Sequence, residues 1–160
     1  MSFDRAYEVL IANEGGYSNH VADNGGETKY GISKARYPMI DIKNLSPEQA
    51  KEITKRDYWD RFRCAELPWP IAVTLFDCVF NHNPVNPAKW LQTAVGVRAD
   101  GVIGSLTIAA ANQPEDHIEV ARDMLVQRMG YFVSLSDWPT FRNGWTRRVL
   151  DTMIGAMREE

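Results

Sequence analysis

Two carboxylates and a hydroxyl near the start of the sequence, Glu14, Asp23 and Thr28, have residue types and a spacing that could do chemistry. At about 100° per residue, Glu14 falls in the middle of the apolar helical face that Phe3 and Leu10 share. A carboxylate in that place is removed from water and lies at the negative end of its helix dipole, so its pKa is expected to rise. A carboxylic acid that stays protonated near neutral pH can serve as a general acid.

Asp23 follows Glu14 across a glycine-rich stretch, and Thr28 comes soon after it. A glutamate at a helix end and an aspartate on a neighbouring ribbon can face each other across a cleft, as in a glycosidase. One acid then protonates the leaving oxygen, and the other carboxylate serves the anomeric side of the sugar. Each residue also has a plain structural interpretation: Glu14 as a frayed helix end turned to water, Asp23 as a turn residue and Thr28 as a strand residue.

To position these residues, the chain needs a helix followed by a small β element. Apolar residues at helical spacing predict a first helix over residues 3–14, which Gly15 and Gly16 end. The turn signal Asn24-Gly25-Gly26 and the alternation over residues 28–32 predict a small, irregular β-hairpin near residues 17–32.

The rest of the sequence predicts helices. Ser46, Pro47 and Gln49 form the pattern of a capping box with proline in the first turn, so a helix begins there. The predicted ranges are about 46–62, 71–82, 87–95, 104–112, 114–135 and 139–157. The fold class is therefore mainly α, with seven or eight helices and one small hairpin.

Three short stretches also carry a family resemblance. They are Glu14-Gly15-Gly16-Tyr17-Ser18-Asn19, Asp23-Asn24-Gly25-Gly26-Glu27-Thr28 and Tyr30-Gly31-Ile32-Ser33. Together they resemble the opening of the glycoside hydrolase family 108 muramidases, and their layout is similar to that of the phage-T4-type lysozymes. The resemblance implies a lysozyme-like domain in which Glu14 is the general acid, while Asp23 and Thr28 position water or stabilise the cation. The gap from Asp23 to Thr28 is one residue shorter than in the T4-type pattern.

Residues 91–107 are similar to the peptidoglycan-binding motif in the C-terminal half of that family. The resemblance implies one lysozyme-like domain over 1–160, with a catalytic part over 1–85 and a helical part over 86–160 that carries this motif. The same residues also read as a helix, a glycine stop, an Asp-Gly turn and a second helix start, which is a purely structural interpretation.

Substrate contacts are expected from aromatic and amide side chains, because sugar rings stack on flat apolar faces. Tyr17 and Tyr30 flank the proposed site in sequence and are the candidates for stacking. Asn81 matches the family asparagine, although the residues around it depart from the usual Val-Asn-x-Gly pattern. A group of arginines could form a positive surface that attracts anionic wall polymers, or a solvated helix face: Arg56, Arg61, Arg63, Arg147 and Arg148.

The composition excludes several other classes of protein. The chain has 160 residues and a net charge of −3, which argues against nucleic-acid binding through a broad cationic face. Cys64 and Cys78 do not make a disulfide framework, and we expect reduced thiols with Cys78 in a core. We expect no metal and no cofactor, because His20 and Asp23 have no third ligand nearby and no phosphate-binding glycine loop is present.

The sequence has no apolar stretch near the ~20 residues of a membrane span and no signal-peptide pattern at its start. We expect a monomer without stable membrane insertion, made in the host cytoplasm and acting on the cell wall or periplasm after release through a membrane pore. A phage endolysin and a bacterial secretion-associated muramidase both fit.

The leading hypothesis is a muramidase that cleaves the β-1,4 bond between N-acetylmuramic acid and N-acetylglucosamine in the glycan strands of peptidoglycan. A non-catalytic peptidoglycan-binding module and a lytic transglycosylase are the alternatives.

Overall fold

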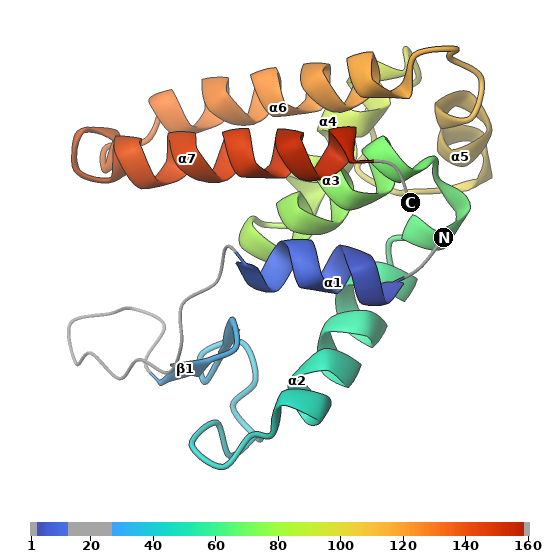
Figure 1. Ribbon diagram of the computed structural model, residues 1–160. Coiled ribbons are helices and arrows are strands. Elements are labelled where there is room, and N and C mark those ends of the chain that lie inside the picture. Colours follow the sequence, from blue (N-terminus) through green and yellow to red (C-terminus); the bar gives the residue numbers. More distant parts are fainter. Residues whose placement is uncertain (1–2, 13–26, 159–160) are drawn as a thin grey trace.

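The computed structural model describes residues 3–12 and 27–158, which form seven α-helices and one two-stranded antiparallel sheet (Figure 1). The elements are α1 (Phe3–Ala12), β1 (Thr28–Lys29), β2 (Ile32–Ser33), α2 (Pro47–Thr54), a π-helix (Lys55–Asp60), a 3-10 helix (Cys64–Glu66), α3 (Trp69–Asn81), α4 (Val85–Ala94), α5 (Ser105–Ala111), α6 (His117–Val133) and α7 (Trp138–Met157). The predicted class, mainly α with a small hairpin, is confirmed.

The hairpin turns at a different place from the one predicted. Thr28 pairs with Ser33 and Lys29 with Ile32, so Tyr30 and Gly31 form the turn between them. Both turn residues have left-handed backbones, with φ of 52° and 76°, as a two-residue hairpin turn of type I′ requires. The expectation of one alternating strand over 28–32 is therefore wrong, and the expected turn at 24–26 lies outside the described residues.

Helix α2 begins as predicted and continues differently. The Ser46 hydroxyl accepts from the Gln49 backbone N–H at 3.1 Å, and the Gln49 side-chain oxygen accepts from the Ser46 N–H at 3.0 Å. This reciprocal pair is the predicted capping box. After Thr54 the helix widens into the π-helix instead of running on as one α-helix to residue 62. Two consecutive aromatic residues there, Tyr58 and Trp59, are both buried.

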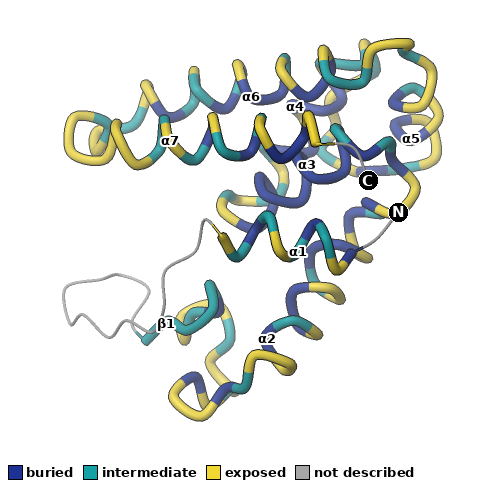
Figure 2. The backbone as a smooth tube through the Cα atoms, viewed as in Figure 1, coloured by how far each residue is buried: buried dark blue, intermediate teal, exposed yellow. Residues whose placement is uncertain are grey.

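Helix α3 is the centre of the molecule. Every residue from Ile71 to Phe80 is buried, and α1, α4, α6 and α7 all contact this helix (Figure 2). A helix that is covered on all sides is expected to be apolar all round, which explains why residues 71–80 are apolar except for Thr74 and Asp77. A second cluster joins α3 and α4 to the α6–α7 pair around Cys78, Trp90 and Phe132. Both cysteines are buried free thiols, as expected.

Capping groups explain where other boundaries differ from the predicted ones. Helix α6 begins at His117 rather than at residue 114, because the Asp116 carboxylate caps it by accepting from the Glu119 N–H at 3.0 Å. Helix α1 is described only to Ala12, so its predicted end at Glu14 lies outside the described residues. Among the helices described, none is long and apolar enough to cross a membrane.

Candidate active site

The predicted site residues divide into two groups. Glu14, Tyr17 and Asp23 lie outside the described residues, whereas Thr28, Tyr30 and Asn81 lie within them. In the part of the chain that the structure describes, no group of three His, Cys, Asp or Glu side chains could hold a metal ion.

Packing fixes the direction of α1, the helix that leads to Glu14. The ring of Phe3 lies 5.8 Å from that of Trp59 and 5.9 Å from that of Phe76, both in edge contacts. Further along, Val9 packs so closely on Gly155 of α7 that a Cβ added at this glycine would lie 2.7 Å from a valine methyl. As a result, the C-terminal end of α1 points to the side of the molecule that carries the hairpin (Figure 1).

The hairpin turn packs beside α1. Thr28 is half-buried in β1, and Tyr30 is half-buried at the turn with its ring against the main core. The Lys29 ammonium lies 5.5 Å from the centre of the Tyr30 ring. Burial raises the pKa of Tyr7 on α1, and the neighbouring Tyr30 phenol adds to this rise. The structure therefore brings Tyr30 to the helix that leads to Glu14.

A tyrosine–carboxylate group, which no sequence pattern predicted, joins the loop after the hairpin to the π-helix. The Tyr37 hydroxyl donates to Asp57 Oδ2 at 3.0 Å and lies 3.4 Å from the Tyr58 hydroxyl. Burial raises the pKa of both tyrosines. The Tyr58 ring also lies 4.8 Å from that of Phe80. Since Phe80 precedes Asn81, this contact sets the hairpin side next to the C-terminal end of α3.

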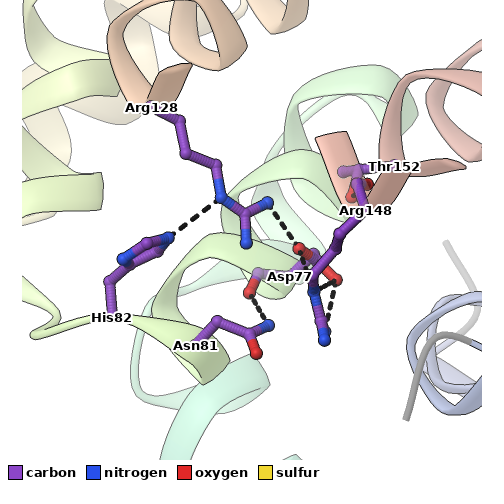
Figure 3. A network of polar contacts seen from close by, with 6 residues as sticks. All are labelled: Asp77, Asn81, His82, Arg128, Arg148 and Thr152. Atoms are coloured by element: carbon purple, nitrogen blue, oxygen red, sulfur yellow. Dashed lines mark hydrogen bonds and ion pairs between the residues drawn. The ribbon is translucent and has the colours of Figure 1, made fainter. Parts of the chain in front are cut away.

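Asn81, the last residue of α3, is exposed. Its Nδ2 donates to the Asp77 carbonyl one turn back at 2.7 Å, which fixes the amide plane. Figure 3 shows the amide oxygen directed away from this hydrogen bond. Asn81 can therefore offer an acceptor to a ligand that approaches the end of the helix.

One helical turn before Asn81, Asp77 belongs to a buried ionic cluster that no sequence pattern predicted (Figure 3). Asp77 accepts from Arg128 Nη1 at 2.7 Å and from Arg148 Nη2 at 2.8 Å. Arg128 is completely buried, and Asp77 almost so. Burial alone would raise the pKa of Asp77, but the charges and hydrogen bonds of the two guanidinium groups together lower it. Such a charged group is tolerated in a core because its partners compensate for lost water.

His82 extends this cluster past the end of α3. Its Nε2 accepts a hydrogen bond from Arg128 Nε at 2.9 Å, and its ring lies among the rings of Trp90 and Phe132 at 5.2 and 5.1 Å. Burial, followed by the charge of Arg128, lowers the pKa of His82 to about 3. The imidazole is therefore neutral at working pH. Arg128 thus donates hydrogen bonds to both Asp77 and His82, which lie on either side of Asn81 in the sequence.

The sequence does contain a signal for this cluster. Asp77 is the one acidic residue in the apolar run 71–80, and Arg128 falls in the buried stripe of α6. A charged residue in a buried run needs a partner of opposite charge, so the sequence predicts that Asp77 is paired but does not show which cation pairs with it.

Three of the five arginines in the expected positive surface have carboxylate partners. Arg56 pairs with Asp57 at 2.7 Å, Arg63 with Glu66 at 2.6 Å, and Arg148 with the buried Asp77. Two of these arginines therefore sit in local surface ion pairs, and the third is part of the core cluster.

In the segment 91–107, the buried side chain of Gln92 holds the turn that follows α4. Gln92 donates to Asp100 Oδ1 at 2.7 Å and to the Val102 carbonyl at 3.0 Å, and its own oxygen accepts from the Gly101 N–H at 2.8 Å. Gly101 has φ of +83°, and a Cβ there would lie 2.9 Å from a Val85 methyl. These groups hold the turn between α4 and α5, which agrees with the structural interpretation of this segment.

Comparisons with known proteins agree with this architecture. Residues 7–82 match the glycosyl hydrolase 108 family, and residues 86–150 match a predicted peptidoglycan domain. The chain is similar to a solved structure of Brucella abortus SagA, with 29% identity and a TM-score of 0.87, over 97% of this chain and 93% of that one. A search of the curated proteins found no match. The helices and the small hairpin fit the predicted lysozyme-like fold, and the predicted resemblance to the glycosyl hydrolase 108 family, with a peptidoglycan domain in the C-terminal half, is confirmed.

Proposed function

We propose that this glycoside hydrolase of peptidoglycan is an N-acetylmuramidase, with Glu14 as its general acid. The observation that carries the proposal is the glycosyl hydrolase match over residues 7–82, which includes Glu14, Asp23 and Thr28. Glu14 gives its proton to the oxygen that leaves with N-acetylglucosamine, and the hydroxide of a water molecule adds to the anomeric carbon of N-acetylmuramic acid. Hydrolysis of the β-1,4 bond then needs no further reactant.

The remaining site residues take supporting roles in this proposal. Asp23 activates the water or stabilises positive charge at the anomeric carbon, and Thr28 helps to hold that water. Tyr17 and Tyr30 offer ring faces to the sugars. Asn81 offers its amide oxygen to a hydroxyl or amide of the substrate, and its exposure and fixed amide plane support this role.

We further propose that the two family segments act as one domain over 1–160 and that the protein works as a monomer without a cofactor. Asp77 belongs to the hydrolase segment, whereas Arg128 and Arg148 belong to the peptidoglycan segment, and their shared cluster supports a common core. Synthesis in the host cytoplasm and release through a membrane pore to the cell wall remain part of the proposal.

Mass spectrometry of purified peptidoglycan after digestion tests the reaction. A muramidase releases fragments that end in reducing N-acetylmuramic acid. A lytic transglycosylase would instead leave 1,6-anhydro ends, and a non-catalytic wall-binding module would release nothing. Either of these last two results would contradict the proposal.

The role of Glu14 is tested by Glu14→Gln, which keeps the size of the side chain and removes the acid. Loss of a general acid costs about 10²–10⁴-fold in rate. Circular dichroism and the unfolding midpoint should stay near those of the wild type. Lysis at a near-native rate by this folded variant would overturn the assignment.

A further inference from the structure

The hairpin and the loop after it carry a net positive charge, opposite in sign to that of the whole chain. This segment, residues 27–45, contains four cations and two carboxylates, so its net charge is +2 in a chain of −3. Its cations are Lys29, Lys34, Arg36 and Lys43. We call it the cationic segment.

None of these four cations has an ion pair with any residue that the structure describes. The Lys29 ammonium donates to the Lys43 carbonyl at 3.0 Å, and the Lys34 ammonium donates to the Ile40 carbonyl at 2.7 Å. Both acceptors are neutral carbonyl groups, so neither hydrogen bond joins a lysine to a carboxylate. The nearby carboxylate of Asp41 accepts instead from Asn44, at 2.8 Å from Nδ2.

Arg36 likewise has no carboxylate partner among the residues that the structure describes. Its guanidinium carbon lies 4.7 Å from the centre of the Tyr58 ring, and the side chain is exposed. The cation–π contact fixes the group while its N–H edges stay open to a ligand. Arg56, in the neighbouring π-helix, differs because both of its bonds go to the Asp57 carboxylate.

Lys29 lies beside one proposed substrate contact, and Arg36 is linked to another through two ring contacts. Lys29 stands between Thr28 and Tyr30 in the hairpin, with its ammonium over the Tyr30 ring. Arg36 lies on Tyr58, whose ring contacts Phe80 next to Asn81. A strand bound at these contacts would therefore place its side groups near two unpaired positive charges.

We propose that Lys29 and Arg36 bind carboxylates of the peptide stems that hang from the glycan strand, with Lys34 and Lys43 adding to the field. The inference rests on the proposed function, because it takes peptidoglycan as the bound polymer. The stems carry free carboxylates, whereas the sugar backbone between them is largely neutral. Planar guanidinium groups suit carboxylates because two N–H bonds can form side by side.

Binding measured without hydrolysis tests the proposal. Glu14→Gln protein is pelleted with Gram-negative sacculi, which carry no teichoic acid, and with the same sacculi after carbodiimide coupling to ethanolamine has turned the stem carboxylates into neutral amides. Lys29→Gln and Arg36→Gln are added singly and together. An exposed ion pair is worth about 0.2–1 kcal/mol, so each change should weaken binding by about 1.4- to fivefold and the two together by about 2- to 30-fold.

Comparing the binding of each variant to the two kinds of sacculi decides the proposal. The double variant should lose affinity for untreated sacculi at low salt, bind the amidated sacculi as well as Glu14→Gln alone does, and show a weaker dependence on salt. Arg142→Gln is the matched control, because it removes an exposed cation of α7 that belongs to neither the cationic segment nor the expected arginine surface. Equal binding by all variants would overturn the proposal, and so would equal weakening on both kinds of sacculi. A failure of the muramidase proposal appears separately, as missing products in the digestion of peptidoglycan by the wild-type enzyme.

Discussion

Replacing Arg128 with methionine tests whether the buried ionic cluster holds the two halves of the chain together. The change keeps most of the side-chain volume and removes the charge. Asp77 would lose its bond of 2.7 Å and keep only Arg148, and His82 would lose its donor at 2.9 Å. Because Arg128 is completely buried, water cannot replace it without opening the contact between α3 and α6.

The expected cost is large. Removing one partner from a buried ion pair costs about 3–5 kcal/mol, because the other charge stays buried without compensation. For a domain of this size, each kcal/mol lowers Tm by about 2–4 °C, so Arg128→Met should lower it by about 6–20 °C. Arg148→Met should cost less, about 1.5–3 kcal/mol, because Arg148 is partly exposed and Asp77 would keep the buried Arg128.

The cluster also predicts how the free energy of unfolding depends on pH, over one pH range set by His82 and a lower one set by Asp77. The pKa of His82 is about 3 in the folded protein and about 6.5 when unfolded, so the unfolded chain binds its proton first. Stability should therefore fall as pH drops from about 6.5 toward 3, by at most about 1.4 kcal/mol per unit. The lowered pKa of Asp77 stabilises the fold above about pH 3.9, and this contribution is lost as pH falls through its folded value.

His82→Gln separates the two pH ranges, because glutamine keeps an acceptor for Arg128 and does not titrate. Urea unfolding at pH 7.5 and 4.5 should show a wild-type loss of up to about 3 kcal/mol that is smaller in the variant. An identical loss in both proteins would refute the assignment to His82. A drop in Tm below about 2 °C for Arg128→Met would refute the argument for the buried pair.

Three further predictions concern the fold. Residues 1–85 expressed alone should show no cooperative urea transition, because they would expose the apolar α3; a folded and lytic fragment would contradict the single-domain proposal. Gly155→Ala should cost about 1–3 kcal/mol in unfolding free energy through its clash with Val9, and Val9→Ala in the same chain should recover most of it; independent, additive costs would be inconsistent with that contact. Ser46→Ala should lower the unfolding free energy by about 1 kcal/mol, whereas an unchanged value would show that the capping box contributes nothing.

Helix starts were the most predictable feature because their signals are local. Ser46 and Gln49 lie three residues apart, and their reciprocal bonds depend on almost nothing else in the fold. Helix α6 shows the limit of this approach. Pro114 and Asp116 both suit a helix start, and only the packing of the chain selects Asp116 as the cap.

The hairpin turn was misplaced because its residues do not look like a turn. Asn24-Gly25-Gly26 carries the usual signal, whereas Tyr30 must adopt φ of 52°, a conformation rare for a bulky residue. Packing of the Tyr30 ring against the core compensates for this backbone cost. Sequence patterns alone could not reveal that tertiary contact.

Ion pairs could be predicted only between residues that lie close together in the sequence. Arg63 and Glu66 lie three residues apart in sequence, and their pairing could have been expected. The partners of Asp77 lie 51 and 71 residues away, in α6 and α7. The sequence shows that a buried carboxylate needs a cation, but only the packing of three helices shows which arginines supply it.

This pairing bears on what the peptidoglycan domain does. Its two arginines hold Asp77, and one of them also holds His82, so the residues on both sides of Asn81 depend on the C-terminal half. A second link is made where Trp69, at the start of α3, donates to the Gly155 carbonyl of α7 at 3.1 Å. A detachable wall-binding module would not need buried charges shared with its neighbour. We therefore expect substitutions in α6 that disturb Arg128 to weaken substrate binding through Asn81 even though they touch no sugar.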